Sequence, residues 1–252
     1  MMQLGVQISS FKPYLQTEAQ MRDTFEKVAA MGCRMVQVQW VAPHIAPAAI
    51  ARALEETGLY SVSTQDTTPQ VLANWEYTLQ LNRLCGSRHI CLSGIPGADD
   101  REHCLAFADQ LSRMAEGLRR EGMVLSFHPL SRDYVPEGEG TLVDLLLENT
   151  PPDLCLGVDL YHAVRAGQDV PALLGRWGER VDFVHCKDYR TDAAGSRLTP
   201  VGQGVINWPP LLAAARDAGV PWVFAEQETW EQDAFVCMAQ SLDYLQKQGL
   251  AL

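Results

Sequence analysis

The sequence predicts a single (β/α)8 barrel, and the chain length, a repeating pattern of strands and helices, and the placement of glycines all indicate this fold class. The chain has 252 residues, of which 47% are hydrophobic, and eight strand and helix units need roughly 250 residues around one large core. Short apolar segments rich in strand-forming residues begin about 25 to about 41 residues apart, which is the size of one such unit. We therefore expect one domain over residues 1–252.

Local patterns place the elements of this barrel. Apolar residues three and four positions apart predict helices, most clearly at residues 17–31, where Met21, Phe25 and Val28 share one face, and at residues 102–120. An open doubly wound sheet would have the same local pattern, but eight units favour a closed barrel. The longest irregular stretch, residues 189–207, is expected to be an active-site loop. The predicted strands are residues 4–8, 35–40, 60–64, 89–93, 124–128, 154–159, 181–185 and 222–226.

Several glycines separate the predicted helices from the strands that follow them. Glycine readily adopts the left-handed conformation that commonly ends a helix, so a glycine between a helical pattern and an apolar run indicates a helix C-terminus. This repeated arrangement supports alternating helices and strands over an all-helical or all-strand fold. The glycines concerned are Gly32, Gly58, Gly86, Gly122 and Gly219.

Charge and composition limit the classes of partner. The 20 Lys and Arg residues against 31 Asp and Glu give a formal net charge of -11, which disfavours a general attraction to nucleic acid. The N-terminal segment has no basic lead, and no segment approaches the roughly 18 apolar residues of a membrane span. Seven cysteines without a CxxC pair indicate reduced thiols. We expect a cytoplasmic protein that binds a small molecule, with no nucleic-acid or membrane partner; assembly into a homo-oligomer stays open.

Polar residues end four consecutive predicted strands. His128, Asp159, His185 and Glu226 occupy equivalent positions at the ends of the fifth to eighth strands, where the catalytic groups of a parallel barrel lie. Such groups are costly to desolvate unless something compensates them, and a shared divalent cation does so. Each residue could instead cap its own strand or pair with a loop amide, but the occurrence of all four favours the cation. Strand alternation points Cys186 away from this site.

Several longer runs resemble a known superfamily. GVQISSF, FHPLSRDY, LGVDLYHAVRAGQDVPALL, RVDFVHCKDYR, VGQGVINW and WVFAEQE are similar to the xylose isomerase-like barrels, particularly their sugar phosphate isomerase/epimerase branch. The resemblance covers the whole chain and is strongest over residues 122–228. It implies one divalent metal ion (Mn, Mg, Co, Zn or Fe) bound by Asp159, His185 and Glu226. His128 stands where the fourth ligand is usually a carboxylate, and Asp133 is an alternative ligand or a substrate contact.

The resemblance also implies substrate contacts, and the sequence departs from it in places. His162 matches a substrate-binding histidine of ketose epimerases, and Lys187 matches a substrate-contacting lysine. Each has a structural alternative: His162 could be a solvent-facing residue at a helix start, and Lys187 could form a salt bridge to Asp188 or Asp182. Gln37 replaces a glutamate that usually ends the second strand, and Gln65 lies where a histidine is expected. We also expect an aromatic wall at the substrate site. Its candidate members are Trp40, Tyr161 and Trp230.

These residues predict a metal-dependent isomerase or epimerase that acts on a small sugar or polyol through an enediolate. Glu226 is the expected base, and His128 or Asp133 is expected to return the proton. The alternative is a dehydratase or lyase of the inosose dehydratase type that acts on a keto-polyol or keto-glycoside, which His128 followed by Pro129 favours. A sugar-binding barrel without turnover is a third interpretation. The related endonuclease IV barrels use a metal cluster with more ligands and a cationic groove, which this acidic chain does not predict.

Overall fold

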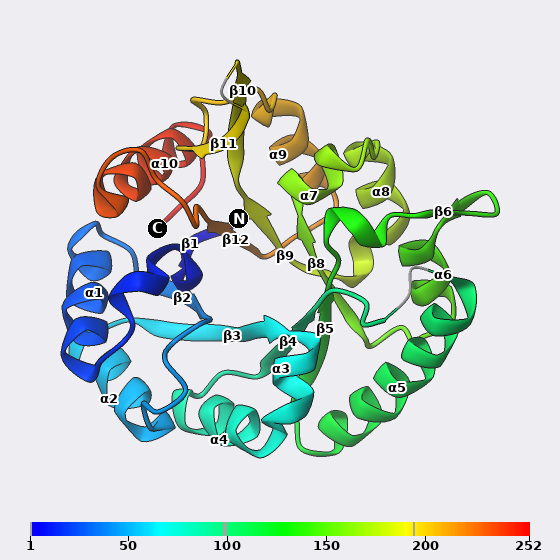
Figure 1. The fold of residues 1–252 in the computed structure, drawn as a ribbon, viewed down its shortest axis with the longest axis horizontal. Coiled ribbons are helices and arrows are strands. Elements are labelled where there is room, and N and C mark those ends of the chain that lie inside the picture. The colour runs from blue at the N-terminus through cyan, green and yellow to red at the C-terminus, as the bar shows by residue number, and fades with distance from the viewer. Residues whose placement is uncertain (1, 98–99, 194) are drawn as a thin grey trace.

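The computed structural model describes residues 2–97, 100–193 and 195–252 and contains a closed barrel of eight parallel strands surrounded by helices (Figure 1). The strands follow one another around the barrel in the order β1-β12-β9-β8-β5-β4-β3-β2. The predicted (β/α)8 barrel is confirmed, and the open doubly wound sheet is excluded. The barrel strands are β1 (Gln3–Gln7), β2 (Met35–Val38), β3 (Tyr60–Thr67), β4 (His89–Ser93), β5 (Val124–His128), β8 (Cys155–Asp159), β9 (Val181–Cys186) and β12 (Trp222–Ala225).

Helices connect the strands and cover the outside of the barrel. All five glycines that were predicted to end helices have positive φ, for example 71° at Gly58 and 67° at Gly86, as a left-handed helix terminus requires. The α-helices are α1 (Glu18–Ala30), α2 (Pro47–Thr57), α3 (Thr68–Ala73), α4 (Trp75–Cys85), α5 (Arg101–Arg120), α6 (Leu142–Glu148), α7 (Leu160–Arg165), α8 (Val170–Trp177), α9 (Trp208–Asp217) and α10 (Ala234–Lys247). Short 3-10 helices are η1 (Ile8–Tyr14), η2 (Ser131–Asp133) and η3 (Gly178–Arg180).

The interior of the barrel is packed and supports the site above it. Met35, Phe183 and Phe224 are fully buried there together with Cys91. Gly157 makes room for this packing, because a Cβ at that position would lie 2.1 Å from the ring of Phe183. Two residues beyond several of these apolar residues, on the same face of the strand, lies a polar residue. A polar layer therefore lies above the apolar layer, toward the carboxyl end of the barrel.

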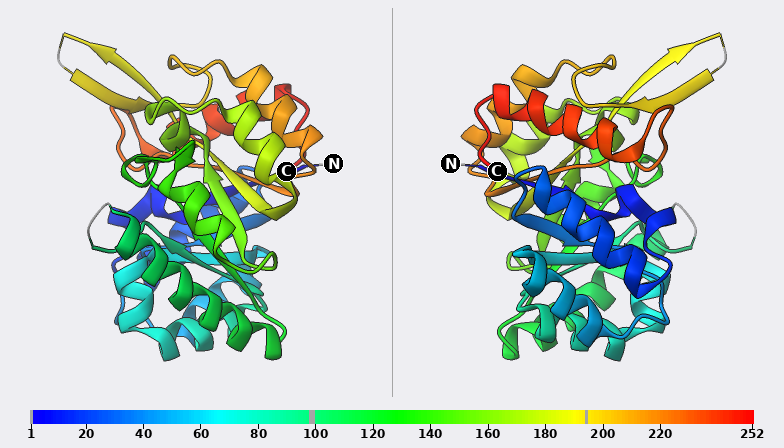
Figure 2. Two further views of the ribbon diagram at one scale, coloured as in Figure 1. Left: turned by 90° about the vertical axis from the view of Figure 1, so that its right-hand side faces the viewer. Right: turned by 90° about the vertical axis from the view of Figure 1, so that its left-hand side faces the viewer.

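The prediction of one irregular loop over residues 189–207 is wrong in its first part. The segment begins with an antiparallel hairpin of β10 (Asp188–Asp192) and β11 (Gly195–Thr199), which extends away from the barrel (Figure 2). A second, shorter hairpin is formed by β6 (Pro136–Glu137) and β7 (Gly140–Thr141). None of the seven cysteines is in a disulfide. Among the described residues, no helix combines the length and apolar character needed to cross a membrane.

Candidate active site

The polar residues predicted at the strand ends form a buried cluster at the carboxyl end of the barrel. Strand register places Asp159 beside His185 and Ser93 beside His128. Candidate ligand atoms of His128, Asp159 and His185 all lie within 4.8 Å of one another. Glu226, which directly follows β12, contacts this group through His185, with Oε2 3.0 Å from Nδ1. The structure therefore brings the four predicted metal ligands into one cluster, three of them most closely.

Hydrogen bonds to the far sides of the two imidazoles orient them toward the cluster. Nε2 of His185 lies 2.7 Å from Oε1 of Gln37, an acceptor, so the hydrogen-bond network assigns the imidazole proton to Nε2 and leaves a lone pair on Nδ1. Nδ1 of His128 lies 3.0 Å from the Ser93 hydroxyl, which can donate or accept a hydrogen bond. Nε2 of His128 and Nδ1 of His185 lie 3.2 Å apart, and a proton on Nε2 of His128 makes this contact a hydrogen bond.

A cation could take the place of the proton between these two nitrogens. Burial, followed by the neighbouring imidazole of His185, lowers the pKa of His128 to about 3, so the ring is a neutral imidazole near neutral pH. The geometry therefore suits a metal ion, whose usual protein ligands include neutral imidazole nitrogens.

The two carboxylates of the cluster each have one oxygen in a hydrogen bond and one that makes ion pairs instead. Oδ1 of Asp159 accepts the backbone N–H of His162 at 3.1 Å, and Oε1 of Glu226 accepts the Ser9 hydroxyl at 2.9 Å. Within the described part of the chain, Oδ2 of Asp159 and Oε2 of Glu226 are buried and make no hydrogen bond. Both lie close to the Lys187 ammonium, which compensates part of their charge. Together with the two imidazole nitrogens, they make a donor set that fits a divalent ion.

Lys187 supplies positive charge at the edge of the cluster. Its Nζ lies 3.2 Å from Oε2 of Glu226, 3.4 Å from Oδ2 of Asp159 and 3.1 Å from Oε1 of Glu228. Burial alone would lower the pKa of Lys187, but these carboxylates raise it well above its usual value. Burial alone would likewise raise the pKa of Asp159 and of Glu226, and the Lys187 ammonium offsets this effect, so both pKa values lie below their usual range. The local salt bridge to Asp182 or Asp188 that was the alternative for Lys187 is not the contact it makes.

His162 lies at the accessible rim of the cluster. Nε2 lies 3.8 Å from Oδ2 of Asp159, and the side chain is 22% exposed, whereas the metal-ligand candidates are almost fully buried. The Ser131 hydroxyl lies 2.9 Å from Nδ1 and fixes the ring. Burial lowers the pKa of His162, so it is neutral near pH 7. This position lets a ligand in the mouth of the barrel reach His162.

Asp133 has both carboxylate oxygens occupied by backbone amides of the loops after β4 and β5. Oδ2 accepts the N–H of Leu130 at 2.7 Å, and Oδ1 accepts the N–H of Ile95 at 3.2 Å. These bonds hold the two loops together and suit a structural role. The sequence did not predict that Ser9, Gln37 and Ser93 hydrogen-bond the metal-ligand candidates. The sequence does contain a sign of these residues, because each is a polar residue inside or just after a short apolar strand.

Asp188 organises the loop that contains the sequence GQG. Its carboxylate accepts one indole and four backbone N–H groups, and a Cβ at Gly204 would lie 2.1 Å from its Oδ1. The glycine is therefore needed for close approach to an aspartate of the same chain. The five donors belong to Tyr189, Gly202, Gly204, Ile206 and Trp208.

The fold and this cluster define a (β/α)8 barrel with a polar site at the carboxyl ends of its strands. The chain belongs to the xylose isomerase-like TIM barrel family, whose model matches residues 25–248. It is 29% identical over 140 residues to an inosose dehydratase of Geobacillus kaustophilus (strain HTA426); the match covers 49% of this chain and 45% of that protein. The chain thus matches less than half the length of this curated relative.

Solved structures share the fold at low sequence identity. A sugar phosphate isomerase/epimerase from Parabacteroides distasonis ATCC 8503 superimposes with a TM-score of 0.81 at 19% identity, over 97% of this chain and 93% of that one. An L-ribulose 3-epimerase superimposes with a TM-score of 0.79 at 14% identity, over 98% and 94% of the two chains. At these identities the superpositions establish the architecture, and the chemistry has to be argued from the residues of the site.

Proposed function

We propose that this chain is a divalent-metal-dependent enzyme of the isomerase/epimerase type, which transfers a proton next to the carbonyl of a small keto-sugar. The observation behind the proposal is the convergence of two imidazole nitrogens and two buried carboxylate oxygens, which make no hydrogen bond to the described residues, in one cluster. His128, Asp159, His185 and Glu226 would hold the ion. When bound, the ion supplies Lewis-acid polarisation of the substrate carbonyl and an adjacent hydroxyl.

Glu226 is the proposed base. Its carboxylate is oriented by the Ser9 hydroxyl at 2.9 Å and is kept ionised by the Lys187 ammonium, so it is ready to accept a proton from carbon near neutral pH. His162 at the rim would hydrogen-bond a substrate hydroxyl. Lys187 would contact a second substrate oxygen while it balances the charge of the carboxylates.

The asymmetry of the site favours isomerisation within this class. Epimerisation at one carbon needs a proton acceptor on one face and a proton donor on the other. The end of β5 provides His128, a proposed metal ligand whose pKa of about 3 keeps it from being the acidic imidazolium near neutral pH. Isomerisation needs one base, because Glu226 can remove a proton from one carbon and return it to the neighbouring carbon on the same face.

Dehydration is the second candidate, and one contact favours it. Oε2 of Glu226 and Nζ of Lys187 are 3.2 Å apart, so a base and a proton donor lie side by side. The carboxylate would take the proton beside the carbonyl, the electron pair would form a carbon–carbon double bond, and the β-hydroxyl would leave as water with a proton from the ammonium. The curated inosose dehydratase relative supports this candidate, although the match covers only about half of each chain.

Metal content and solvent exchange test the proposal. Purified protein loaded with Mn²⁺ should bind one equivalent by elemental analysis, and Asp159→Ala and Glu226→Ala should bind far less. The metal-loaded protein is then incubated in D₂O with a set of ketoses and inososes. NMR should show that deuterium replaces the hydrogen on the carbon beside the carbonyl of at least one of them. Formation of an aldose from the ketose would identify an isomerase. Loss of water from the substrate, which gives an enone that absorbs ultraviolet light, would identify a dehydratase.

Glu226→Gln separates metal binding from proton transfer. The amide keeps one coordinating oxygen but is not basic, so exchange should fall by about 10²- to 10⁴-fold while metal remains bound. Glu148→Gln, at a half-exposed ion pair with Arg176, is the matched control and should exchange normally. Wild-type metal content in both alanine variants would overturn the metal site. Binding of a sugar with no exchange by the metal-loaded wild type would instead favour a non-catalytic binding protein.

A further inference from the structure

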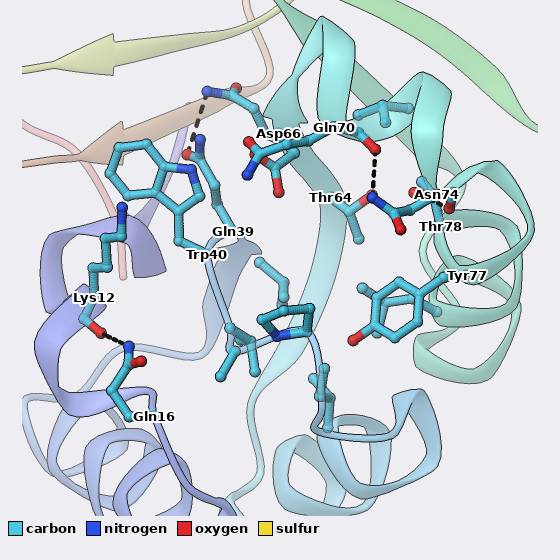
Figure 3. A pocket seen from close by; sticks show the side chains of 18 residues that line it. Lys12, Gln16, Gln39, Trp40, Thr64, Asp66, Gln70, Asn74, Tyr77 and Thr78 are labelled. Carbon is cyan, nitrogen blue, oxygen red and sulfur yellow. Dashed lines mark hydrogen bonds between the residues drawn. The ribbon is translucent and has the colours of Figure 1, made fainter.

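A separate cavity of about 420 Å³ opens beside Trp40, between η1 and the carboxyl ends of β2 and β3 (Figure 3). It lies at the same end of the barrel as the metal-ligand cluster, because both are built from the carboxyl ends of parallel strands. None of the four predicted metal ligands lines it. Its volume falls within the roughly 300–1,000 Å³ of small-molecule pockets.

A short row of residues along β2 links the two sites. Gln37 contacts His185 of the cluster at 2.7 Å. Gln39, two residues further along and just beyond the end of β2, lines the cavity and accepts a long hydrogen bond from Gln65. Two residues of a strand span about 7 Å, which is the scale of one sugar ring. One molecule with two ring-sized parts could therefore occupy both sites.

The cavity contains a polar atom that lacks a partner. Gln65 is only 6% exposed, and among the residues that the structure describes, none donates a hydrogen bond to its Oε1. Its Nε2 donates to Oε1 of Gln39 at the long distance of 3.4 Å. A buried acceptor of this kind is costly unless a ligand or water satisfies it. A hydroxyl group would donate to Gln65 at this position.

The wall and charge of the cavity suit a neutral hydroxylated ligand. Trp40 has a φ of 58°, and such backbone strain in a bulky residue is concentrated at functional sites. The Lys12 ammonium lies 4.2 Å from the centre of the Trp40 ring. Lys12 and Asp66 are opposite charges on the lining, and the remaining polar groups are mainly amides, including Gln70. This balance favours a sugar or polyol unit over a phosphate.

We propose that this cavity binds a second neutral, hydroxylated unit, so that the preferred substrate is a two-part sugar such as a keto-glycoside rather than a free monosaccharide. The inference rests on the proposed function, in which the reacting unit lies at the metal-ligand cluster. Gln65 would donate and accept hydrogen bonds to the second unit, and the Trp40 ring would pack against its C–H surface.

Binding measurements test the cavity without relying on turnover. Isothermal titration of the metal-loaded protein with cellobiose, maltose, trehalose, methyl β-D-glucoside and glucose 6-phosphate compares two-ring, one-ring and anionic probes. At least one disaccharide should bind about tenfold or more tightly than the glucoside, which corresponds to about 1.4 kcal/mol. Gln65→Leu and Trp40→Gly should each lower the affinity for that disaccharide about tenfold, so that it no longer exceeds the affinity for the glucoside. The glycine allows the positive φ, and circular dichroism of both variants checks folding.

Val236→Ala, an exposed change on α10, is the control and should keep the disaccharide preference. The inference is overturned if no disaccharide binds more tightly than the glucoside, if both cavity variants keep the preference, or if glucose 6-phosphate is the tightest probe and depends on Gln65. Failure of the proposed function is distinct, because it would show as absent deuterium exchange while the disaccharide preference and its loss in Gln65→Leu persist.

Discussion

Replacing Asp188 with asparagine should destabilise the protein strongly, although the substitution keeps the size of the side chain. Oδ2 accepts three N–H groups and Oδ1 accepts two, at 2.8 to 3.3 Å. The amide nitrogen of asparagine cannot accept, so at least two of these bonds are lost and their donors face another donor. Hydrogen bonds to a charged group contribute about 1.5–3 kcal/mol each, which gives a loss of about 3–6 kcal/mol.

Urea unfolding followed by circular dichroism measures this loss in the free energy of unfolding. Thermal unfolding gives a second measurement: in a domain of this size each kcal/mol of lost stability lowers Tm by about 2–4 °C, so Tm should fall by at least about 6 °C. Limited proteolysis should also cut the loop over residues 200–207 more readily. Asp243→Asn, at an exposed helical ion pair with Lys247, is the matched control and should cost less than about 0.5 kcal/mol. A loss below about 1 kcal/mol in Asp188→Asn would refute the role given to this carboxylate.

Three further predictions concern the site and the barrel core. Gln37→Leu removes the acceptor of the His185 Nε2–H and should weaken Mn²⁺ binding about 10- to 100-fold in a metal titration; unchanged affinity would contradict the assigned tautomer. Burial lowers the pKa of His128 from 6.5 to about 3, so the neutral ring fits the folded protein and the charged ring does not. The free energy of unfolding of the metal-free protein should therefore be highest above pH 6.5 and should fall as the pH drops toward 3. Denaturant titrations of His128→Gln should show a smaller fall over the same pH range. Gly157→Ala should cost about 1–3 kcal/mol by overpacking the barrel interior, whereas Gly175→Ala, with open space around its Cβ, should not destabilise.

The sequence was sufficient to predict the barrel because its signals are local and repeated. Each predicted strand lies within a few residues of an observed one, since short apolar runs between helix-ending glycines leave little choice of position. The hairpin of β10 and β11 was missed for the opposite reason. Its strands are largely exposed, so no core imposes an alternation of apolar and polar residues, and its charged sequence looks like a loop.

The second half of the site was predictable, and the first half was not. A carboxylate or imidazole at the end of an apolar strand is unusual enough to indicate chemistry, and His128, Asp159 and His185 do converge. Gln37 is a weak candidate from the sequence because it replaces the glutamate that usually ends the second strand in the family it resembles. Its importance depends on a contact across the barrel to His185, and a sequence separation of 148 residues gives no local sign of that contact.

The glutamine at position 37 has an electrostatic consequence for the proposed chemistry. Asp159 and Glu226 together provide two negative charges, which balance a divalent ion, and the only cation in contact with both in the described structure is Lys187. A glutamate at position 37 would add a third carboxylate beside His185 and lower the ability of the ion to polarise a carbonyl. Gln37 accepts the same imidazole proton without adding charge. Gln37 therefore retains the orientation of His185 and leaves Glu226 as the one proposed base, and this asymmetry is the reason that we propose one-base isomerisation or elimination over two-base epimerisation.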